Sequence, residues 1–537
     1  MEMSERNVAR STDAVVVGAG PVGMTSAALL AARGINVIVL EMRSGTSEEP
    51  KAISIDDEAL RTYQQAGIDH DISSIIVPGT GTRYYDAGNR PVFQARGATP
   101  FRLGHPFKNP FAQPDLEKVL AQGLINHERV TLEYDTKVTN VEQDDDFAYV
   151  TTEGPKGTEV LAARYVLGAD GGRSVVRELV MDNAMSGRSY SDVWLVADTL
   201  EDPHTERYGM HHGDPKRPHV IVPGLDGRCR YEFRLFAGEG EPSQAPDFEL
   251  IKRLVAPYRD IEPHQVERAI NYRFNAVNAD RYREGRFFLL GDAAHMMPPF
   301  AGQGLNSGIR DAANLTWKVA EVVKGKAPDS ILDSYEPERK PHAGAIIAQS
   351  VRLGSVVMTT SERVARNRDE VIRQKLGTAD GRAFFEEMRY RPIAQFVSDL
   401  SVTHNAGRAI GQPLVFDATS RTTARMDHVV GNDWVLLGVD VASESWAEAK
   451  QVAERFDASR WYIPFDDVQP RTAEVDGLLI DLDGSLYREF EEYRGKFVLV
   501  RPDHFTSAVF APDELAVILE KTASLRQNKA SLAVASV

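Results

Sequence analysis

Runs of apolar residues separated by a glycine-rich turn mark the start of the chain. Val15–Val17 form a short β-branched run, which is typical of a buried strand in a parallel sheet. The alanine-rich apolar segment 24–32 predicts a helix that Gly34 ends, and residues 35–40 predict a second strand. The order strand, turn, helix and strand therefore predicts a βαβ unit.

The turn between the first strand and the helix has the spacing G-x-G-x-x-G, formed by Gly18, Gly20 and Gly23. The first glycine permits a tight turn, the second lets the backbone approach a pyrophosphate, and the third lets the helix pack on the strand. Free N–H groups at the helix start are suited to binding phosphates. Glu41 follows the second strand, where a carboxylate binds ribose hydroxyls. The unit predicts a dinucleotide site without specifying which dinucleotide.

Two further glycine-rich stretches follow strand-like runs. In 165–177, Asp170 begins a turn that either faces ribose and pyrophosphate groups or simply caps a helix. In 286–318, a buried strand ends at Asp292, two prolines prevent helix formation, and a long helix begins near Asn306. Backbone N–H groups at this helix start suit an electron-rich group, and an isoalloxazine ring fits.

The pattern changes to strict alternation between 189 and 275. In 230–235 the apolar residues fall on one face with a period of two, which predicts an antiparallel sheet with one covered face. Such a sheet is a plausible wall for an apolar substrate. The histidines in this region fit no zinc-binding spacing, so we predict no metal site from them. They are His204, His211, His212 and His219.

The chain after about residue 392 is expected to form a separate unit. Residues 434–438 and 495–500 read as strands, with helices near 446–456 and 512–525. This unit contains no cysteine, so thiol chemistry is excluded and a structural or association role is expected. The segment 335–374, which precedes it, is predicted to be mostly helical.

Composition narrows the function classes. A chain of 537 residues predicts two or three domains, and the net charge of -16 argues against nucleic acid and anionic membranes as partners. The single cysteine, Cys229, excludes a disulfide framework and cysteine-based metal sites, and it fits a reducing cytoplasm. The polar segment 1–12 and the glycines after it give no expectation of a signal peptide or a membrane span.

The stretches GAGPVG…E, GADGGRS and GDAAHMMPPFAGQGLNSGIRDAANLTWK together resemble the single-component FAD-dependent aromatic hydroxylases in order and spacing. The likeness covers essentially the whole chain. It implies an α/β fold with a Rossmann-like FAD-binding domain over 1–188 and 276–391. It also implies an inserted β-sheet substrate domain over 189–275 and a thioredoxin-like C-terminal domain over 392–537.

The resemblance also implies which residues contact the cofactor. These residues are Gly18, Gly20, Val22, Gly23, Glu41, Arg43, Gln113, Asp170, Asp292, Pro299, Gly302, Gln303, Gly304, Leu305 and Asn306. Pro299 and His295 lie nearest to the reacting edge of the flavin by sequence and are the candidate catalytic residues. A purely structural role for His295 remains the alternative. Arg230 or Arg234 is a candidate cation for an anionic substrate side chain, and a surface salt bridge is the other use of either.

The implied reaction uses FAD, with NADH or NADPH as a transient co-substrate, because no second complete G-x-G-x-x-G unit is present. A C4a-hydroperoxyflavin formed from O2 would hydroxylate a phenolic substrate ortho or para to its hydroxyl. The expected partners are a small aromatic compound and O2, with no nucleic acid, membrane or metal, and we consider a homodimer as the assembly.

Three other readings of the sequence stay open. A NAD(P)-dependent dehydrogenase explains the first motif but leaves residues 291–306 without a purpose. An FAD-dependent oxidase or reductase that inserts no oxygen shares the same motifs. A non-enzymatic flavin-binding interaction protein also shares them.

Overall fold

The structure is a computed structural model that describes residues 7–48, 51–79, 81–465 and 475–526. The chain divides into two compact units. The first consists of Met1–Ala98, Pro106–Ala312 and Ala343–Pro392, and the second of Thr99–His105, Ala313–His342 and Ile393–Val537. Among the helices of the described ranges, none is both long enough and apolar enough to cross a bilayer.

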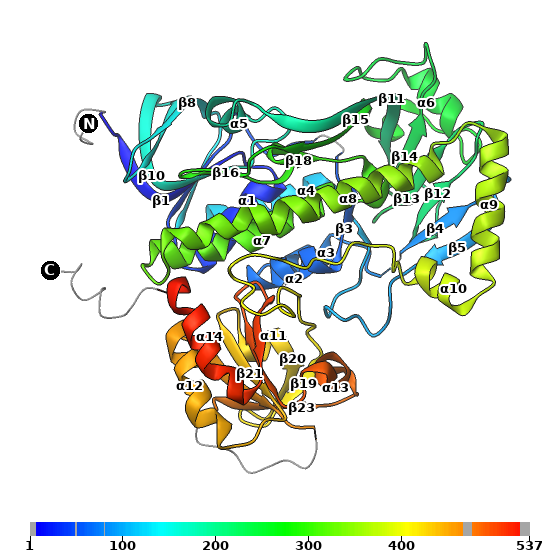
Figure 1. The fold of residues 1–537 in the computed structure, drawn as a ribbon. Coiled ribbons are helices and arrows are strands. Elements are labelled where there is room, and N and C mark those ends of the chain that lie inside the picture. Colours follow the sequence, from blue (N-terminus) through cyan, green and yellow to red (C-terminus); the bar gives the residue numbers. More distant parts are fainter. Residues whose placement is uncertain (1–6, 49–50, 80, 466–474, 527–537) are drawn as a thin grey trace. The chain divides into compact units, whose positions relative to one another are not determined.

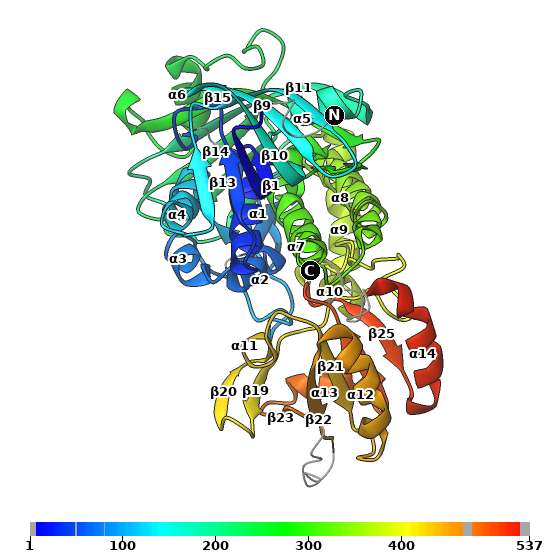
Figure 2. The same cartoon turned by 90° about the vertical axis from the view of Figure 1, so that its left-hand side faces the viewer.

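A mostly parallel sheet forms the first layer of the first unit (Figures 1 and 2). Its parallel strands are, in spatial order, β7 (Val130–Glu133), β2 (Val37–Leu40), β1 (Arg10–Val17), β10 (Gly157–Gly168) and β17 (Phe287–Leu289). In chain order this arrangement is 3-2-1-4-5, the order of a Rossmann sheet. The antiparallel strands β16 (Arg283–Glu284), β8 (Lys137–Gln143) and β9 (Ala148–Gly154) extend it.

Helices cover this sheet, and glycine-rich turns connect its strands to two of them. The first strand leads into α1 (Pro21–Ala32), which packs against α4 (Gln113–Ile125), and β10 leads into the short α5 (Val175–Val180). The β-branched and aliphatic residues of β1 and β2 are buried, as expected for strands covered on both faces. The βαβ unit predicted at the start of the chain is therefore present.

An eight-stranded mixed sheet forms the second layer of the first unit. Its order is β18 (His295–Met296), β15 (Val266–Ala279), β11 (Met185–Thr199), β14 (Cys229–Arg234), β13 (His219–Pro223), β12 (Gly209–His212), β4 (Thr82–Tyr85) and β5 (Pro91–Ala95). The alternation over 189–275 predicted only its middle strands. The strands β4 and β5 join from a segment far earlier in the chain, because β4 pairs in parallel with β12.

The two faces of this second sheet have different surroundings. On one face, Tyr231 and Phe233 pack with α6 (Phe248–Val255) in a buried apolar cluster. On the other face, a row across neighbouring strands places His211, Val220 and Glu232 in register. The predicted covered face is thus the one under α6, and the opposite face is available to line a cavity.

Several helices and short strands complete the first unit. They include β3 (Ser54–Ile55) paired with β6 (Asn109–Pro110), α2 (Asp57–Gln65), α3 (Asp69–Ser74), α9 (Glu362–Leu376) and α10 (Ala379–Glu386). The long helices α7 (Gly304–Val323) and α8 (Tyr335–Val357) each contribute residues to both units. The expectation of a mostly helical segment over 335–374 is therefore confirmed.

The second unit is a thioredoxin-like domain with additions. Its core is β21 (Val435–Val439), α12 (Ser445–Phe456), β22 (Ser459–Ile463), α13 (Ser485–Phe490), β24 (Lys496–Val500), β25 (Thr506–Phe510) and α14 (Leu515–Lys521). The spatial order β22-β21-β24-β25, with β24 and β25 antiparallel, is the thioredoxin-like arrangement. The strands β23 (Gly477–Asp481), β19 (Leu414–Asp417) and β20 (Thr422–Arg425) and helix α11 (Met426–Val430) are added beside it. The exact domain limits drawn from the sequence stay predictions.

Candidate active site

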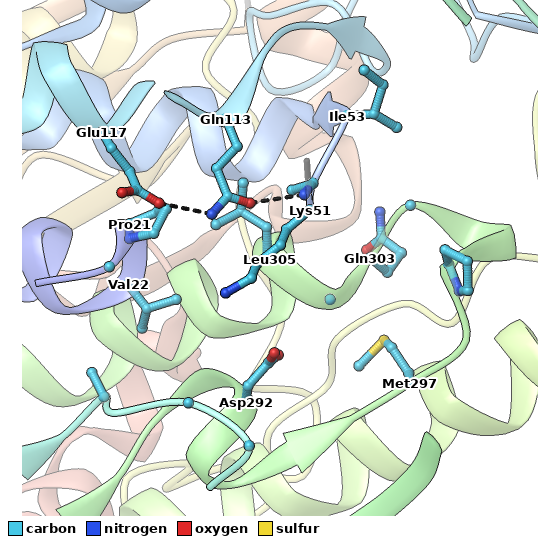
Figure 3. Close-up of a pocket in the computed structure, with 18 of the residues that line it drawn as sticks. Pro21, Val22, Lys51, Ile53, Gln113, Glu117, Asp292, Met297, Gln303 and Leu305 are labelled. Carbon is cyan, nitrogen blue, oxygen red and sulfur yellow. Dashed lines mark hydrogen bonds between the residues drawn. The ribbon is translucent and has the colours of Figure 1, made fainter. Parts of the chain in front are cut away.

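A cavity of about 680 Å³ lies within the first unit and is lined by residues from all three glycine-rich stretches (Figure 3). Its lining includes almost every residue expected to contact the cofactor. Those residues are Gly18, Gly20, Val22, Glu41, Arg43, Gln113, Asp170, Asp292, Pro299, Gly302, Gln303, Gly304 and Leu305. Gly23 and Asn306 are not lining residues, but each contacts one: Gly23 packs against Gly18, and Asn306 donates to the carbonyl of Gly302.

The first glycine turn shows why each glycine is needed. Gly18 has a φ of +100°, and a Cβ there would lie 2.6 Å from the carbonyl oxygen of Ala169. A Cβ on Gly23 would lie 1.9 Å from the carbonyl oxygen of Gly18, so helix and strand pack directly on each other. At Gly20 a Cβ would meet nothing within 4 Å. The turn is therefore closed on its protein side and open toward the cavity, where a phosphate can approach the helix N-terminus.

Glu41 stands at the end of β2 and is held by the same turn. Its carboxylate accepts hydrogen bonds from the backbone N–H of Ala19 at 2.9 Å and from the backbone and Nε of Arg43 at 3.0 Å. Burial raises the pKa of Glu41, but these hydrogen bonds outweigh burial and keep the pKa below its ordinary value. The side chain is thus an ionised acceptor on the cavity wall, which suits ribose hydroxyls.

Gln113 reaches the cavity from the start of α4, but both ends of its amide are engaged. Its Oε1 accepts from the backbone N–H of Ala52 at 2.8 Å, and its Nε2 donates to Glu117 at 2.8 Å (Figure 3). Glu117 also accepts from the backbone N–H of Ser47 at 2.7 Å. The sequence analysis missed Glu117, although its position four residues after Gln113 on one helix signals a pair. Together they fix the loop that borders the cavity.

Asp170 and Asp292 present carboxylate oxygens that the protein does not satisfy. Asp170 caps the start of α5, accepting from the backbone N–H of Val175 at 2.7 Å, while its other oxygen is buried without a partner. Asp292 points into the cavity (Figure 3) and makes no hydrogen bond or ion pair within the described part of the chain. Burial raises the pKa of both carboxyls. Hydroxyl donors from a ligand would stabilise both groups.

The loop before α7 forms a further wall. A short turn of 3-10 helix ends at Gly302, which has a φ of +63°, and α7 begins two residues later at Gly304. Asn306 does not reach the cavity, because its Oδ1 accepts from the backbone N–H of Asp56 at 3.0 Å and its Nδ2 donates to the carbonyls of Ser54 and Gly302. The side chain of Asn306 therefore holds the loop in place through both ends of its amide.

Comparison with known proteins decides the family. The family model described as an FAD binding domain matches residues 11–350, and one described as the HcaD C-terminal domain matches residues 407–525. A 3-(3-hydroxy-phenyl)propionate/3-hydroxycinnamic acid hydroxylase of Mycolicibacterium smegmatis is 36% identical over 439 residues, covering 80% of this chain and 77% of the relative. The chain belongs to the FAD-dependent aromatic hydroxylases.

Other relatives agree along nearly the full length. A hydroxylase of the same name from Comamonas testosteroni is 31% identical, with 97% of this chain and 98% of the relative covered. The crystal structure of the flavin-dependent monooxygenase PieE with FAD and substrate superposes with a TM-score of 0.78 at 18% identity, over 96% of this chain and all of that one. The fold, the FAD cofactor and the reaction class, NAD(P)H-dependent hydroxylation of an aromatic compound, are therefore shown.

The cavity fits FAD on its own chemistry. The open space at Gly20 suits a pyrophosphate, and Glu41 suits the adenosine ribose. The unsatisfied oxygens of Asp170 and Asp292 suit hydroxyls along the rest of the cofactor. Backbone N–H groups at the start of α7 suit the flavin ring, since Gly304 has open space on its Cβ side.

His295 does not line the cavity, so the structure gives no support for a position beside the reacting edge. It is fully buried, and its Nε2 lies 2.7 Å from Oδ2 of Asp311 on α7. The same oxygen accepts from the backbone N–H of Gly291 at 3.0 Å. His295 thus ties the Gly291 turn to the helix, which favours the structural alternative. Of the two candidate catalytic residues, only Pro299 lines the cavity.

Arg230 and Arg234 do not supply a cation to the cavity either. Arg230 is buried and donates to Asp198 at 2.7 and 3.0 Å and to the carbonyl of Lys51 at 2.6 Å. Arg234 donates to Asp192 and to the carbonyl of Met358. Neither side chain lines the cavity. The expectation fails because the antiparallel partner strand supplies a carboxylate to each guanidinium, and for Arg230 that pair lies in the interior rather than on the surface.

Several ionisable residues of the cavity wall were missed by the sequence analysis, and three of them bear on the substrate. They are Lys108, His211 and Glu232. Lys108 lies in a segment rich in glycine, proline and aromatic residues, and nothing in its spacing marks it out. His211 and Glu232 alternate with apolar residues along β12 and β14, and this alternation was the available signal. The apolar part of the same wall consists of Val196, Val220, Val222, Phe274 and Phe300.

Among the residues that the structure describes, one cluster of potential metal ligands occurs away from the cavity. Ligand atoms of Asp202, His204 and Cys229 all lie within 4.8 Å of one another. Nη1 of Arg259 lies 3.2 Å from Asp202, and the hydroxyl of Tyr231 donates to Asp202 at 2.9 Å. Because a guanidinium already neutralises the carboxylate, the cluster reads as a buried ion-pair network, not as a cation site.

Proposed function

We propose that this enzyme hydroxylates a phenol that carries a small side chain, ortho or para to the existing hydroxyl, using NADH or NADPH and O2. The observation that carries the proposal is that a single cavity joins the FAD-binding residues to the sheet wall. Relatives that are 31–36% identical over most of the chain and are named hydroxylases of 3-(3-hydroxyphenyl)propionate support it. A phenol is the natural acceptor because its oxygen raises electron density at the ortho and para carbons.

The wall chemistry suits an aromatic ring beside the flavin. Phe274 and Phe300 form edge-on ring contacts with each other and pack with Trp194 around the loop that includes Pro299. Valines of the sheet continue this surface. A flat apolar ring can lie against such a wall while a few polar groups set its orientation. The polar groups available there are Lys108, His211 and Glu232.

Bound FAD supplies the redox chemistry of the reaction, which no side chain of the protein can provide. The role of the protein residues is to bind and orient the cofactor and the substrate. Glu41, Asp170 and Asp292 would hold cofactor hydroxyls, and backbone N–H groups at the start of α7 would hold the flavin ring. The backbone at Pro299 would help to position the substrate, and the apolar wall would keep water out of the cavity.

Stopped-flow reduction of bound FAD by NADH and by NADPH, with and without a phenolic acid, tests the proposal. The expected result is faster reduction with the phenol present, together with a product whose mass is raised by one oxygen. Equal reduction rates in both conditions and no oxygenated product across a broad panel of phenols would refute it. Product formed without oxygen gain would favour the oxidase or reductase, and flavin binding without any turnover would favour the interaction protein.

Three further expectations belong to this proposal. A cytoplasmic location is supported by the single, buried cysteine. A homodimer is the proposed assembly, which sedimentation analysis would test. The thioredoxin-like domain is proposed to be redox-silent, because residues 392–537 contain no cysteine.

A further inference from the structure

Lys108 is a cation on the cavity wall that the protein does not pair. It lies just before β6, and its Nζ would be 3.7 Å from a Cβ placed on Gly302 of the flavin-facing loop. Within the described ranges Lys108 makes no hydrogen bond and no ion pair. Burial lowers the pKa of Lys108 to about 8, and the charge of Asp56 only partly opposes this. A buried ammonium without a partner is unfavourable until an anion arrives.

The acids near Lys108 are committed to other groups. Asp56 caps α2 by accepting from the backbone N–H of Ala59 at 2.9 Å, and its other oxygen accepts from Gln303 at 3.1 Å and from Arg310. Arg310 therefore neutralises Asp56. Asp56, the acid whose charge acts on Lys108, is thus already paired with another cation.

His211 and Glu232 complete the polar part of the wall without balancing Lys108. Burial and the charge of Lys108 lower the pKa of His211 to about 3, so its imidazole is neutral near pH 7. Glu232 lies two strands farther along the same row, which is about 10 Å away. Nη1 of Arg230 lies 3.9 Å from Glu232. The positive charge of Lys108 is consequently left facing the cavity.

We propose that Lys108 binds an oxyanion of the aromatic substrate, with His211 lining the same cavity. The oxyanion is either the phenolate or a carboxylate on the side chain. The inference rests on the proposed function and gives Lys108 the role that the sequence analysis had offered to Arg230 or Arg234. It also predicts that uncharged aromatic compounds are poor ligands.

Ligand titration of the FAD-loaded enzyme in the absence of NAD(P)H tests the assignment. The ligands are 3-(3-hydroxyphenyl)propionate, its primary amide and 3-(3-methoxyphenyl)propionate, and the Kd is measured from the change in flavin absorbance. The amide lacks the carboxylate, and the methyl ether cannot form a phenolate. Lys108→Met is compared with wild type and with Lys118→Met, which alters an exposed lysine of α4.

Lys108→Met is expected to weaken binding of the hydroxy acid by about tenfold to a hundredfold, as for loss of a charge-assisted hydrogen bond. If the amide is unaffected while the ether is weakened, the oxyanion is the carboxylate. If the ether is unaffected while the amide is weakened, it is the phenolate. Lys118→Met should leave all three Kd values unchanged, and Lys108→Arg should restore part of the lost affinity.

Kd values within about twofold of wild type for all three ligands in Lys108→Met would overturn the inference. FAD content and the unfolding midpoint check the variant, and Lys108→Gln repeats the test if the methionine variant loses FAD. Loss of FAD from both, with FAD retained by Lys118→Met, would assign Lys108 to the cofactor and overturn the inference. If the wild-type enzyme binds no phenol at all, the proposed function itself fails.

Discussion

Arg501 and Glu338 form a fully buried bidentate ion pair in the second unit. Nη1 and Nη2 of Arg501 donate to the two oxygens of Glu338 at 2.6 and 2.9 Å, and both side chains are inaccessible to solvent. Glu338 also accepts from Lys318 at 2.8 Å and from Asn314 at 2.7 Å. Burial raises the pKa of Glu338, but the charges of Arg501 and Lys318 outweigh burial and hold it far below its ordinary value. Arg501 also pairs with Asp503 at 2.6 Å, so Glu338 is the carboxylate that the two buried cations share.

Removing that carboxylate is expected to destabilise the protein. Glu338→Gln keeps the shape but leaves the buried Lys318 without its carboxylate partner and Arg501 with Asp503 alone, at a cost of about 3–5 kcal/mol in the free energy of unfolding. Urea unfolding followed by tryptophan fluorescence measures this. Glu336→Gln, on the same helix but on a partly exposed side chain, should change the value by less than about 0.5 kcal/mol. Equal stability of the two variants would contradict the prediction.

Asp292 gives a prediction about cofactor retention. Asp292→Ala removes an unpaired carboxylate that faces the cavity, so hydroxyls of FAD lose an acceptor at a cost of roughly 1–3 kcal/mol, or about 5- to 150-fold in FAD affinity. Equilibrium dialysis of the apoprotein with FAD measures the change. Asp145→Ala, at an exposed hairpin end, is the matched control and should bind FAD as wild type does. An unchanged Kd for Asp292→Ala would remove Asp292 from the cofactor site.

The glycine turn predicts two different outcomes for the same substitution. Gly23→Ala places a methyl group 1.9 Å from a backbone oxygen, so the turn must shift and the variant should lose both stability and FAD. Gly20→Ala meets no protein atom within 4 Å, so the apoprotein should keep its stability while FAD affinity falls, because the methyl group obstructs only the ligand. Apoprotein unfolding midpoints and FAD Kd values separate the two effects. Normal FAD affinity in Gly20→Ala would contradict the proposed position of the pyrophosphate.

The pair formed by His204 and Asp202 predicts a pH dependence of stability. Nδ1 of His204 lies 2.5 Å from Asp202, and this contact raises the pKa of His204 above 6.5. Burial raises the pKa of Asp202, but the hydrogen bonds from His204 and Tyr231 outweigh burial and lower it to about 2. The contribution of His204 to the free energy of unfolding is fully present below pH 6.5 and is lost as the pH rises through the raised pKa. The contribution of Asp202 to the free energy of unfolding is present above pH 3.8 and is lost as the pH falls toward 2.

The stability difference between wild type and His204→Asn should therefore be largest between about pH 4 and 6.5 and should shrink toward pH 9. Thermal unfolding of both proteins at pH 5, 7 and 9 gives the comparison. His264→Asn alters a histidine for which no carboxylate partner is found in the described chain, and it serves as the control. A difference that grows with pH would show that the pair is not charged in the folded protein.

Local spacing explains why the FAD side of the site was predictable. The glycines at 18, 20 and 23 are dictated by contacts within a few residues, and Glu41 follows at the end of the next strand. Asp292 stands at the end of a strand that an apolar run marks clearly. These features depend on short-range geometry, which the order of residues records directly.

The substrate side depends on pairings that local sequence does not record. Thr82 and His211 line one cavity because β12 pairs in parallel with β4, a strand far earlier in the chain. Lys108 lines the same cavity from beside β6, and no local spacing relates it to His211. The imidazole of His295 does not line the cavity, because it is paired with Asp311 on the following helix. The guanidinium of Arg230 does not line the cavity either, because it pairs with Asp198, which lies opposite it in register on β11. The expectations for His295 and Arg230 therefore missed partners that only the tertiary structure brings close.

The burial of Cys229 has a practical consequence for following this enzyme at work. It is the only cysteine of the chain, it is buried on β14, and burial raises the pKa of its thiol well above the ordinary value. Thiol-directed reagents need an accessible thiolate, so the native protein should resist labelling. A single cysteine introduced on an exposed helix would then accept a fluorophore or spin label selectively. The wild-type background is already suited to such probes, with no residue to be removed first.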